Sequence, residues 1–358
     1  MAVTIKKIAE LAGVSMGTVD RALHDRGRVN PAVAQRIKQI AAELNYHPNS
    51  VAKSLSIRNK NLKIAIILHI QSRNIYFDDV IRGIQRCKDE IKDFGISVDL
   101  KLCPDFNAQA QLALIDEAIE EGANALAIVP INSPLIRDRV NSLCSKHFPV
   151  VFLTNMIEDT DCLSFVGCNY RLAGQITAGL LNLISPQGGK LLLFSPGFQM
   201  YGHVLRAKAL EQQLIDSYPQ IQLQQIYEMT GDDIQDCQIT RQALADYPDT
   251  DLFVCPGAYS RGNLQAIREL GYFKRAKILC YDCSKEVGEE IKSRNITAAI
   301  IQRPQQQGYN AVKILFEYLT SDTLPKTKNH FIKTRILLRE NLCEADWDEK
   351  EAVRGWGR

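Results

Sequence analysis

The first hydrophobic pattern of the chain has the period of an amphipathic helix. Four apolar residues fall on one helical face: Ile5, Ile8, Ala9 and Ala12. Thr4 stands in front of them as an N-cap, and Gly13 breaks the pattern with a residue that tolerates a left-handed turn. Ser15 can cap a second helix, whose inward side is again apolar: Val19, Ala22 and Leu23. The pattern predicts two short helices joined by a tight turn.

A third helix is predicted from its cap and its apolar face. Asn30 can cap it, Pro31 suits its first position, and its inward residues are Val33, Ile37, Ile40, Ala41 and Leu44. Together the three helices form a head over residues 1–48. Residues 50–58 have the composition of a further short helix, but nine residues are too few to hold a helix in water without a partner. We therefore expect residues 49–60 to be a linker with conditional structure.

From Leu62 onward, short apolar runs alternate with amphipathic stretches. The expected strands cover 64–69, 98–102, 125–129, 150–153, 163–166, 190–194, 223–227, 252–255, 277–281 and 298–301. The expected helices cover 79–93, 108–121, 134–146, 171–184, 201–217, 234–246, 260–270, 285–293 and 304–320. Regular alternation of this kind predicts parallel sheets covered by helices on both faces, and so many units indicate two lobes with a cleft between them. Residues 343–358 form a charged tail.

Charge separates the head from the rest of the chain. The net charge of the 358 residues is +2, yet the first sixty, the head with its linker, carry ten Lys or Arg against four Asp or Glu, so this segment is +6 and the remainder −4. A basic head predicts a polyanionic partner. The ten cysteines are irregularly spaced and are expected to be reduced side chains. Only Cys280 and Cys283 have a redox or metal spacing, and no second ligand pair accompanies them, so no cofactor is expected.

The second helix exposes the face that a helix-turn-helix places in the major groove. The segments 4–15, 18–21, 44–49 and 51–55 resemble the lactose-repressor family of bacterial regulators. Segments 74–77, 128–132, 166–169, 205–206 and 281–282 resemble landmarks of the periplasmic sugar-binding fold that this family uses as a sensor. The resemblance implies an all-α helix-turn-helix head on a two-lobed α/β body of the type I periplasmic-binding-protein kind, with parallel sheets. Within the body (61–342), lobe 1 would hold 61–166 and 303–326, and lobe 2 would hold 167–302 and 327–342.

The residues expected to contact DNA lie in the head and the linker: Thr4, Ser15, Met16, Gly17, Thr18, Arg21, Arg28, Asn49, Ala52, Lys53 and Leu55. Arg21 lies on the exposed face of the second helix, which favours DNA over a merely solvated role. In the family, the positions of Met16 and Gly17 carry the main base-reading side chains, and here neither can form a bidentate hydrogen bond. Leu55 matches a leucine that the family inserts between base steps in the minor groove; the alternative is a linker leucine packed on the body. Two half-sites imply a homodimer and a near-palindromic operator.

The residues expected to bind an effector, all but Arg206 chosen because they follow the carboxyl ends of strands, are Tyr76, Phe77, Asp78, Asn132, Asn155, Arg206, Asp282 and Gln302. The two aromatic residues could stack on a sugar ring, or each could belong to the core. Arg206 matches an arginine that usually holds sugar hydroxyls in the family. Thr154 and Asn155 stand where many relatives have an Asp-Arg pair, which indicates a polar, uncharged effector. A pentose, a hexose, a cyclitol and a nucleoside all remain open.

These features together predict a cytoplasmic, ligand-controlled transcriptional regulator, which is not an enzyme. The effector could release the protein from DNA or tighten its binding. A sugar-binding transport protein would explain the body but not the head, and would need a signal peptide, which the sequence does not show at its start. An enzyme is disfavoured because the sequence contains neither a phosphate-binding glycine loop nor a nucleophile elbow, and its six histidines form no ligand cluster. No apolar run is long enough for a membrane span.

Overall fold

A computed structural model describes residues 4–23, 29–44, 46, 57–70, 75–104, 106–197 and 200–344. Five of the expected DNA contacts lie outside these ranges: Arg28, Asn49, Ala52, Lys53 and Leu55. The tail from residue 345 also lies outside them. Within the described residues, no helix is long and apolar enough to cross a membrane.

The head contains α1 (Ile5–Ala12), α2 (Met16–Leu23) and α3 (Pro31–Glu43), as the hydrophobic pattern predicts. The Thr4 side chain accepts a hydrogen bond from the Lys7 amide at 3.3 Å, and Ser15 Oγ accepts one from the Thr18 amide at 3.2 Å. Gly13 has the left-handed φ of 68° that the turn requires. The helices meet in a small core centred on three fully buried residues: Ile8, Val19 and Ile37. The helix-turn-helix is therefore confirmed in its caps, turn and core.

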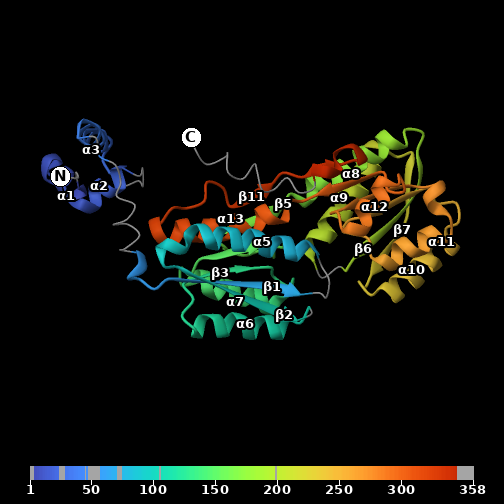
Figure 1. Cartoon of the computed structure of the whole chain (residues 1–358), viewed down its shortest axis with the longest axis horizontal. Coiled ribbons are helices and arrows are strands. Elements are labelled where there is room, and N and C mark those ends of the chain that lie inside the picture. Colours follow the sequence, from blue (N-terminus) through green and yellow to red (C-terminus); the bar gives the residue numbers. More distant parts are fainter. Residues whose placement is uncertain are drawn as a thin grey trace.

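Lobe 1 is a six-stranded sheet in the order β11-β5-β4-β3-β1-β2. Its strands are β1 (Lys63–Ile70), β2 (Ser97–Pro104), β3 (Ala125–Ile128), β4 (Val150–Leu153), β5 (Ser164–Cys168) and β11 (Asn329–Ile332). One face is covered by α5 (Ile75–Ile91) and α13 (Pro304–Ser321), and the other by α6 (Ala108–Glu120) and α7 (Pro134–Ser145) (Figure 1). The central strands are buried on both faces, which explains why they are apolar throughout.

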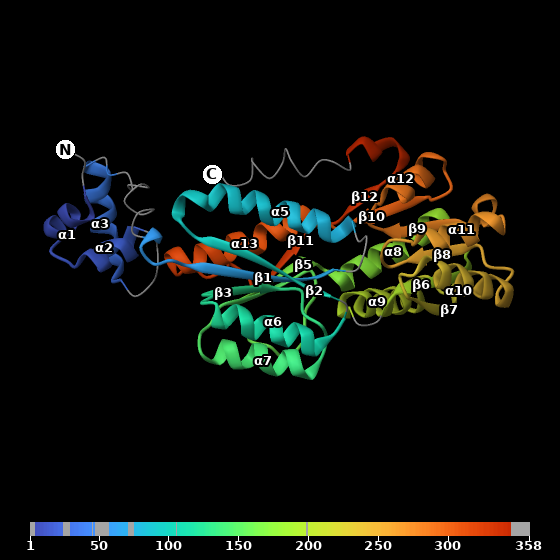
Figure 2. The same ribbon diagram turned by 60° about the horizontal axis from the view of Figure 1, so that its bottom comes forward.

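Lobe 2 repeats the plan with the order β12-β10-β9-β8-β6-β7, except that the edge strand β12 pairs antiparallel with β10, which corrects the expectation of a fully parallel sheet. Its strands are β6 (Gly189–Pro196), β7 (Ile221–Met229), β8 (Leu252–Cys255), β9 (Lys277–Tyr281), β10 (Ala298–Ile301) and β12 (Arg335–Leu337). Helices α8 (Tyr170–Ile184) and α9 (Tyr201–Ser217) cover one face. The other face is covered by α10 (Asp233–Asp246), α11 (Arg261–Glu269) and α12 (Lys285–Lys292) (Figure 2).

The chain passes between the lobes after β5, after β10 and after β11. This topology corrects one boundary, because residues 327–342 were all expected in lobe 2. Instead β11 pairs in parallel with β5, with Phe331 opposite Gly167, and so belongs to lobe 1. Both β11 and β12 are short edge strands with exposed residues, such as Phe331 at 46% exposure, and therefore lack the continuous apolar run that marks the central strands.

Candidate DNA-binding and effector sites

The outward face of α2 is exposed to solvent and combines polar residues with the apolar Met16. Ser15, Met16, Gly17 and Arg21 are exposed, and Met16 reaches 56%. Thr18 Oγ1 lies 3.0 Å from Ser15 Oγ and accepts a hydrogen bond from Arg21 Nη2 at 3.5 Å. A Cβ atom added at Gly17 would meet only Ser15 Oγ, at 3.9 Å, so packing inside the head does not require a glycine there. Arg21 lies in the last turn of α2, and its guanidinium reaches back one turn toward Thr18.

Arg206 is the largest fully buried side chain of the body. It projects from α9 and donates hydrogen bonds to the Pro256 carbonyl and, at 2.6 Å, to Gln302 Oε1. Its guanidinium lies 3.7 Å from the ring centroid of Tyr281 and 5.1 Å from that of Tyr170. Hydrogen bonds and two aromatic faces hold the charge in a fixed orientation where lobe 2 meets lobe 1.

Gln302 joins Arg206 to the carboxylate of Asp282. Its Nε2 donates to Asp282 Oδ2 at 2.7 Å, while its Oε1 accepts from Arg206. Asp282 follows β9 with a left-handed φ of 59°, a backbone conformation that aspartate tolerates better than most residues. Burial raises the pKa of Asp282 to about 6, although the charge of Arg206 works against this shift. The structure thus places three of the predicted effector residues in one hydrogen-bonded chain.

Two polar atoms in the hydrogen-bonded group of Arg206, Gln302 and Asp282 have no hydrogen-bond partner among the described residues. They are Asp282 Oδ1, an acceptor, and Arg206 Nε, a donor. An unpaired buried polar atom costs on the order of 1–3 kcal/mol, more when it is charged. A small molecule with hydroxyl groups could satisfy both atoms, because each hydroxyl can donate and accept.

A second set of hydrogen bonds connects the Arg206–Gln302–Asp282 group to lobe 1. Gln307 Nε2 donates to the Gln302 carbonyl at 2.8 Å, and Tyr76 Oη donates to Gln307 Oε1 at 3.0 Å. Burial raises the pKa of Tyr76 well above its usual value, so its hydroxyl stays a donor. Asn155, fully buried, donates to the Pro130 carbonyl at 2.7 Å and accepts from the Gly202 amide at 3.3 Å. Tyr76 and Asn155 therefore lie at the junction, and each already holds a protein partner.

The remaining predicted effector residues are not part of the hydrogen-bonded group around Arg206. Phe77 is 9% exposed and belongs to the lobe 1 core, which favours the core interpretation of this ring. Asp78 in the first turn of α5 and Asn132 after β3 are both exposed. Gln307 and Tyr170 were not predicted. The available signals were weak: Gln307 lies five residues after Gln302 in a glutamine-rich helix start, and Tyr170 begins a helix after a strand.

His203 also faces the buried side of α9. Burial lowers its pKa to about 4, so the ring is neutral near pH 7, and its Nδ1 lies 2.6 Å from the Pro196 carbonyl. We assign it a structural contact with the end of β6. Among the described residues, no three His, Cys, Asp or Glu side chains are placed to hold a metal ion.

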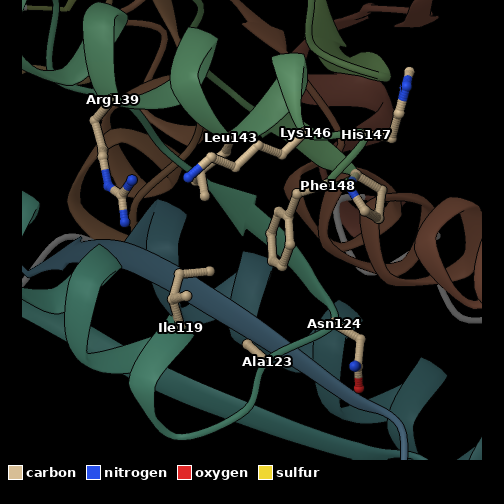
Figure 3. Close-up of a pocket in the computed structure, with 9 residues that line it drawn as sticks. Ile119, Ala123, Asn124, Arg139, Leu143, Lys146, His147 and Phe148 are labelled. Atoms are coloured by element: carbon tan, nitrogen blue, oxygen red, sulfur yellow. The ribbon is translucent and has the colours of Figure 1, made fainter.

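A separate hollow of about 350 Å³ lies between α6 and α7 in lobe 1 (Figure 3). Its lining combines an apolar floor with a basic rim: Ile119, Ala123, Asn124, Arg139, Leu143, Lys146, His147, Phe148 and Pro149. Asn124 precedes β3 and Pro149 precedes β4, so the hollow is at the amino ends of these strands. Open parallel sheets bind ligands at the opposite ends, where Arg206 and Asp282 lie. The hollow is therefore distinct from the candidate effector site around Arg206 and Asp282.

Comparison with known proteins assigns both parts of the chain. Residues 4–49 match the bacterial regulatory proteins of the lacI family, and residues 64–323 match the periplasmic binding protein domain family. The chain belongs to the periplasmic binding protein domain family and carries a lacI-family helix-turn-helix head. Among its lacI-family relatives, the ribose operon repressor of Bacillus subtilis (strain 168) is 27% identical over 332 residues, 90% of this chain and 94% of the relative. Catabolite control protein A of Priestia megaterium is 23% identical over 331 residues, 90% and 95% of the two chains.

Solved structures share the fold of the body. A LacI transcriptional regulator from Bacteroides fragilis has a TM-score of 0.72 at 18% identity, covering 79% of this chain and 99% of that one. A transporter solute-binding protein from Bacillus halodurans C-125 with bound myo-inositol has a TM-score of 0.71 at 14% identity, covering 79% and 96%. At these identities the likeness concerns the fold alone. The two-lobed architecture and the helix-turn-helix head predicted from the sequence are confirmed.

Proposed function

We propose that this protein is a transcriptional repressor that binds operator DNA through its head and releases it in response to a small polyol bound between its lobes. One observation carries the proposal. The same protein has an exposed, basic helix-turn-helix and, in its body, the buried hydrogen-bonded side chains of Arg206, Gln302 and Asp282, with two unpaired polar atoms. The relatives that cover most of the chain are themselves named as a repressor and a control protein. A transport protein would have no use for the head.

The polyol is uncharged in this proposal. Arg206 and Asp282 already offer one positive and one negative charge on either side of Gln302, so a charged ligand would leave one of them uncompensated. Hydroxyl groups can accept from Arg206 Nε and donate to Asp282 Oδ1 without adding charge. Pentoses, hexoses and cyclitols meet this requirement, and the name of the Bacillus subtilis relative makes D-ribose the first compound to test.

The active unit is a homodimer in this proposal, because one small head buries less DNA surface than most specific complexes. Two heads related by a twofold axis would read a near-palindromic operator, with half-sites about one helical turn or a multiple of it apart. The cytoplasm, where the chromosome lies, is the compartment in which this function can operate.

The test is a fluorescence anisotropy titration of duplex DNA from the promoter next to the protein's own gene. Specific binding should exceed binding to a scrambled duplex by about a thousandfold or more, and should weaken steeply with added salt because the basic head displaces counterions. D-ribose, L-arabinose, D-glucose, myo-inositol and adenosine are then added separately, after a thermal-shift screen with the same compounds. Equal affinity for promoter and scrambled duplexes would contradict the proposal.

A further inference from the structure

The buried interior of lobe 1 continues into lobe 2. One hydrophobic cluster joins Phe165 of β5 to Tyr170 and Tyr281 of lobe 2. The ring centroids of Phe165 and Tyr170 are 6.4 Å apart, and Tyr281 is 1% exposed. Met200, the residue before α9, packs on the cluster that covers the other face of the lobe 1 sheet. The lobes are therefore closed on each other, and moving them apart would expose these side chains to water.

Two hydrogen bonds cross between the lobes at neighbouring residues. Both lobe 1 acceptors come directly after β4: the Thr154 carbonyl accepts from the Tyr170 hydroxyl, and Asn155 Oδ1 accepts from the Gly202 amide at 3.3 Å. The donors and acceptors all belong to the protein, so these bonds form without a bound molecule. We call these four residues the lobe contact: Thr154, Asn155, Tyr170 and Gly202.

Gly202 brings α9 close to the lobe contact. It is the second residue of the helix, so its amide has no acceptor within α9 and uses Asn155 of the other lobe instead. A Cβ atom added at Gly202 would lie 2.5 Å from Cζ of the Tyr170 ring, so a larger residue would push α9 away from that ring. Arg206 follows one turn later on the same face of α9. The lobe contact therefore fixes the helix that carries this arginine.

The backbone that presents Asn155 is strained. Thr154 has a positive φ of 57°, which a β-branched residue rarely adopts, and the Asn155 amide donates to the Leu153 carbonyl at 2.6 Å in a tight turn. Thr154 Oγ1 is also buried without a hydrogen-bond partner among the described residues. Strain of this kind persists where the surrounding contacts impose it. Here those contacts are the two bonds to lobe 2 and the bond from Asn155 Nδ2 to the Pro130 carbonyl.

We propose that Asn155 is a positioning residue that holds lobe 2 on lobe 1 in the effector-free protein by binding the Gly202 amide. The inference goes beyond the proposed function, because it concerns the body before any effector is bound. Arg206 is 1% exposed while the lobe contact is closed, so an effector reaches it only after the contact has opened. Asn155 thus acts on the effector site through α9, and the opening of the lobe contact limits the rate of effector binding.

Amide hydrogen exchange of the full-length protein without any sugar tests the inference. Mass spectrometry with residue-level fragmentation follows the Gly202 amide, whose acceptor is Asn155 Oδ1. Asn155→Ala removes this acceptor and should speed exchange of the Gly202 amide about tenfold or more. Tyr170→Phe removes only the hydroxyl that binds the Thr154 carbonyl. It is the milder second variant should Asn155→Ala fail to fold, and should speed the same exchange about threefold.

Asn310→Ala is the matched control for Asn155→Ala. Asn310 is also a buried asparagine of lobe 1, 5% exposed, but its Nδ2 lies 3.0 Å from His330 Nε2 of the same lobe. Its loss should leave exchange of the Gly202 amide unchanged. Equal exchange of this amide in the wild type and in Asn155→Ala, or the same acceleration in Asn310→Ala, would overturn the inference.

A second measurement follows the rate of effector binding and rests on the proposed function. Rapid mixing uses the sugar that raises the melting temperature. Asn155→Ala should increase its association rate constant about threefold or more, because the lobe contact no longer has to open first. An asparagine that touched the sugar would instead change the dissociation rate when lost, so an unchanged association rate would overturn the inference. If no sugar binds at all, the proposed function fails while the exchange result still decides the inference.

Discussion

Asp282→Asn should remove a specific part of the pH dependence of folding stability. Burial raises the pKa of this carboxyl from 3.8 to about 6, against the opposing charge of Arg206. Because the folded-state value is the higher one, the folded state gains stability as the pH falls through 6 and holds the full gain below about 4. This difference in pKa corresponds to a total gain of about 3 kcal/mol in the free energy of unfolding. About 1.4 kcal/mol of the gain is reached when the pH falls from 7 to 5.

Thermal and urea denaturation followed by far-ultraviolet circular dichroism at pH 5, 6 and 7 measure this effect. The stability of the wild type relative to Asp282→Asn should rise by about 1.4 kcal/mol from pH 7 to pH 5, because the asparagine does not titrate. Asp249→Asn makes the same chemical change on a side chain that is 78% exposed, and should follow the wild type. A constant difference between wild type and Asp282→Asn across this range would show that the carboxyl is not desolvated.

Four further substitutions test separate parts of the account. Arg206→Lys should lower the affinity for the sugar about a hundredfold, because lysine keeps the charge but not the planar donors. The sugar is the one that raises the melting temperature, and its affinity is measured by calorimetry. Gly308→Ala should destabilise lobe 1 by about 1–3 kcal/mol or more in melting experiments, whereas an alanine at Gly179, whose nearest neighbour would be 3.9 Å away, should not. Ser15→Ala should cost the head about 1 kcal/mol and speed amide exchange in α2, since the cap is lost. Arg21→Ala should weaken operator binding about tenfold and reduce the salt slope by about one, and an unchanged slope would argue against a phosphate contact.

The local features of the head could be predicted because each is set by neighbouring residues. Thr4, Gly13 and Ser15 act within one helical turn, so a cap or a left-handed turn can be recognised from the sequence around it. The central strands could be predicted for a similar reason, since burial on both faces demands apolar residues throughout. Edge strands such as β11 need not be apolar throughout. The position of β11 in lobe 1 depends on where the polypeptide crosses between the lobes, which the local sequence does not indicate.

At the candidate effector site, the residue types could be predicted from the sequence but their contacts could not. Arg206, Asp282 and Gln302 were expected there from the family resemblance and from their positions after strands, and the structure brings them into one chain. Gln302 bridges Arg206 and Asp282 only because the segment between β10 and α13 passes directly beside α9. The sequence does not predict this arrangement. Phe77 shows the converse case, because a residue next to the site by sequence turns its ring into the lobe 1 core.

The most direct test of the account is whether operator and effector affinities are linked in one molecule. The operator Kd is measured with and without a saturating concentration of the sugar found by thermal shift, and the sugar Kd is measured with and without saturating operator. We predict that the sugar weakens operator binding by about tenfold or more, and that the operator weakens sugar binding by the same factor, because linkage is reciprocal. A sugar that binds the body but leaves the operator Kd unchanged would contradict the account.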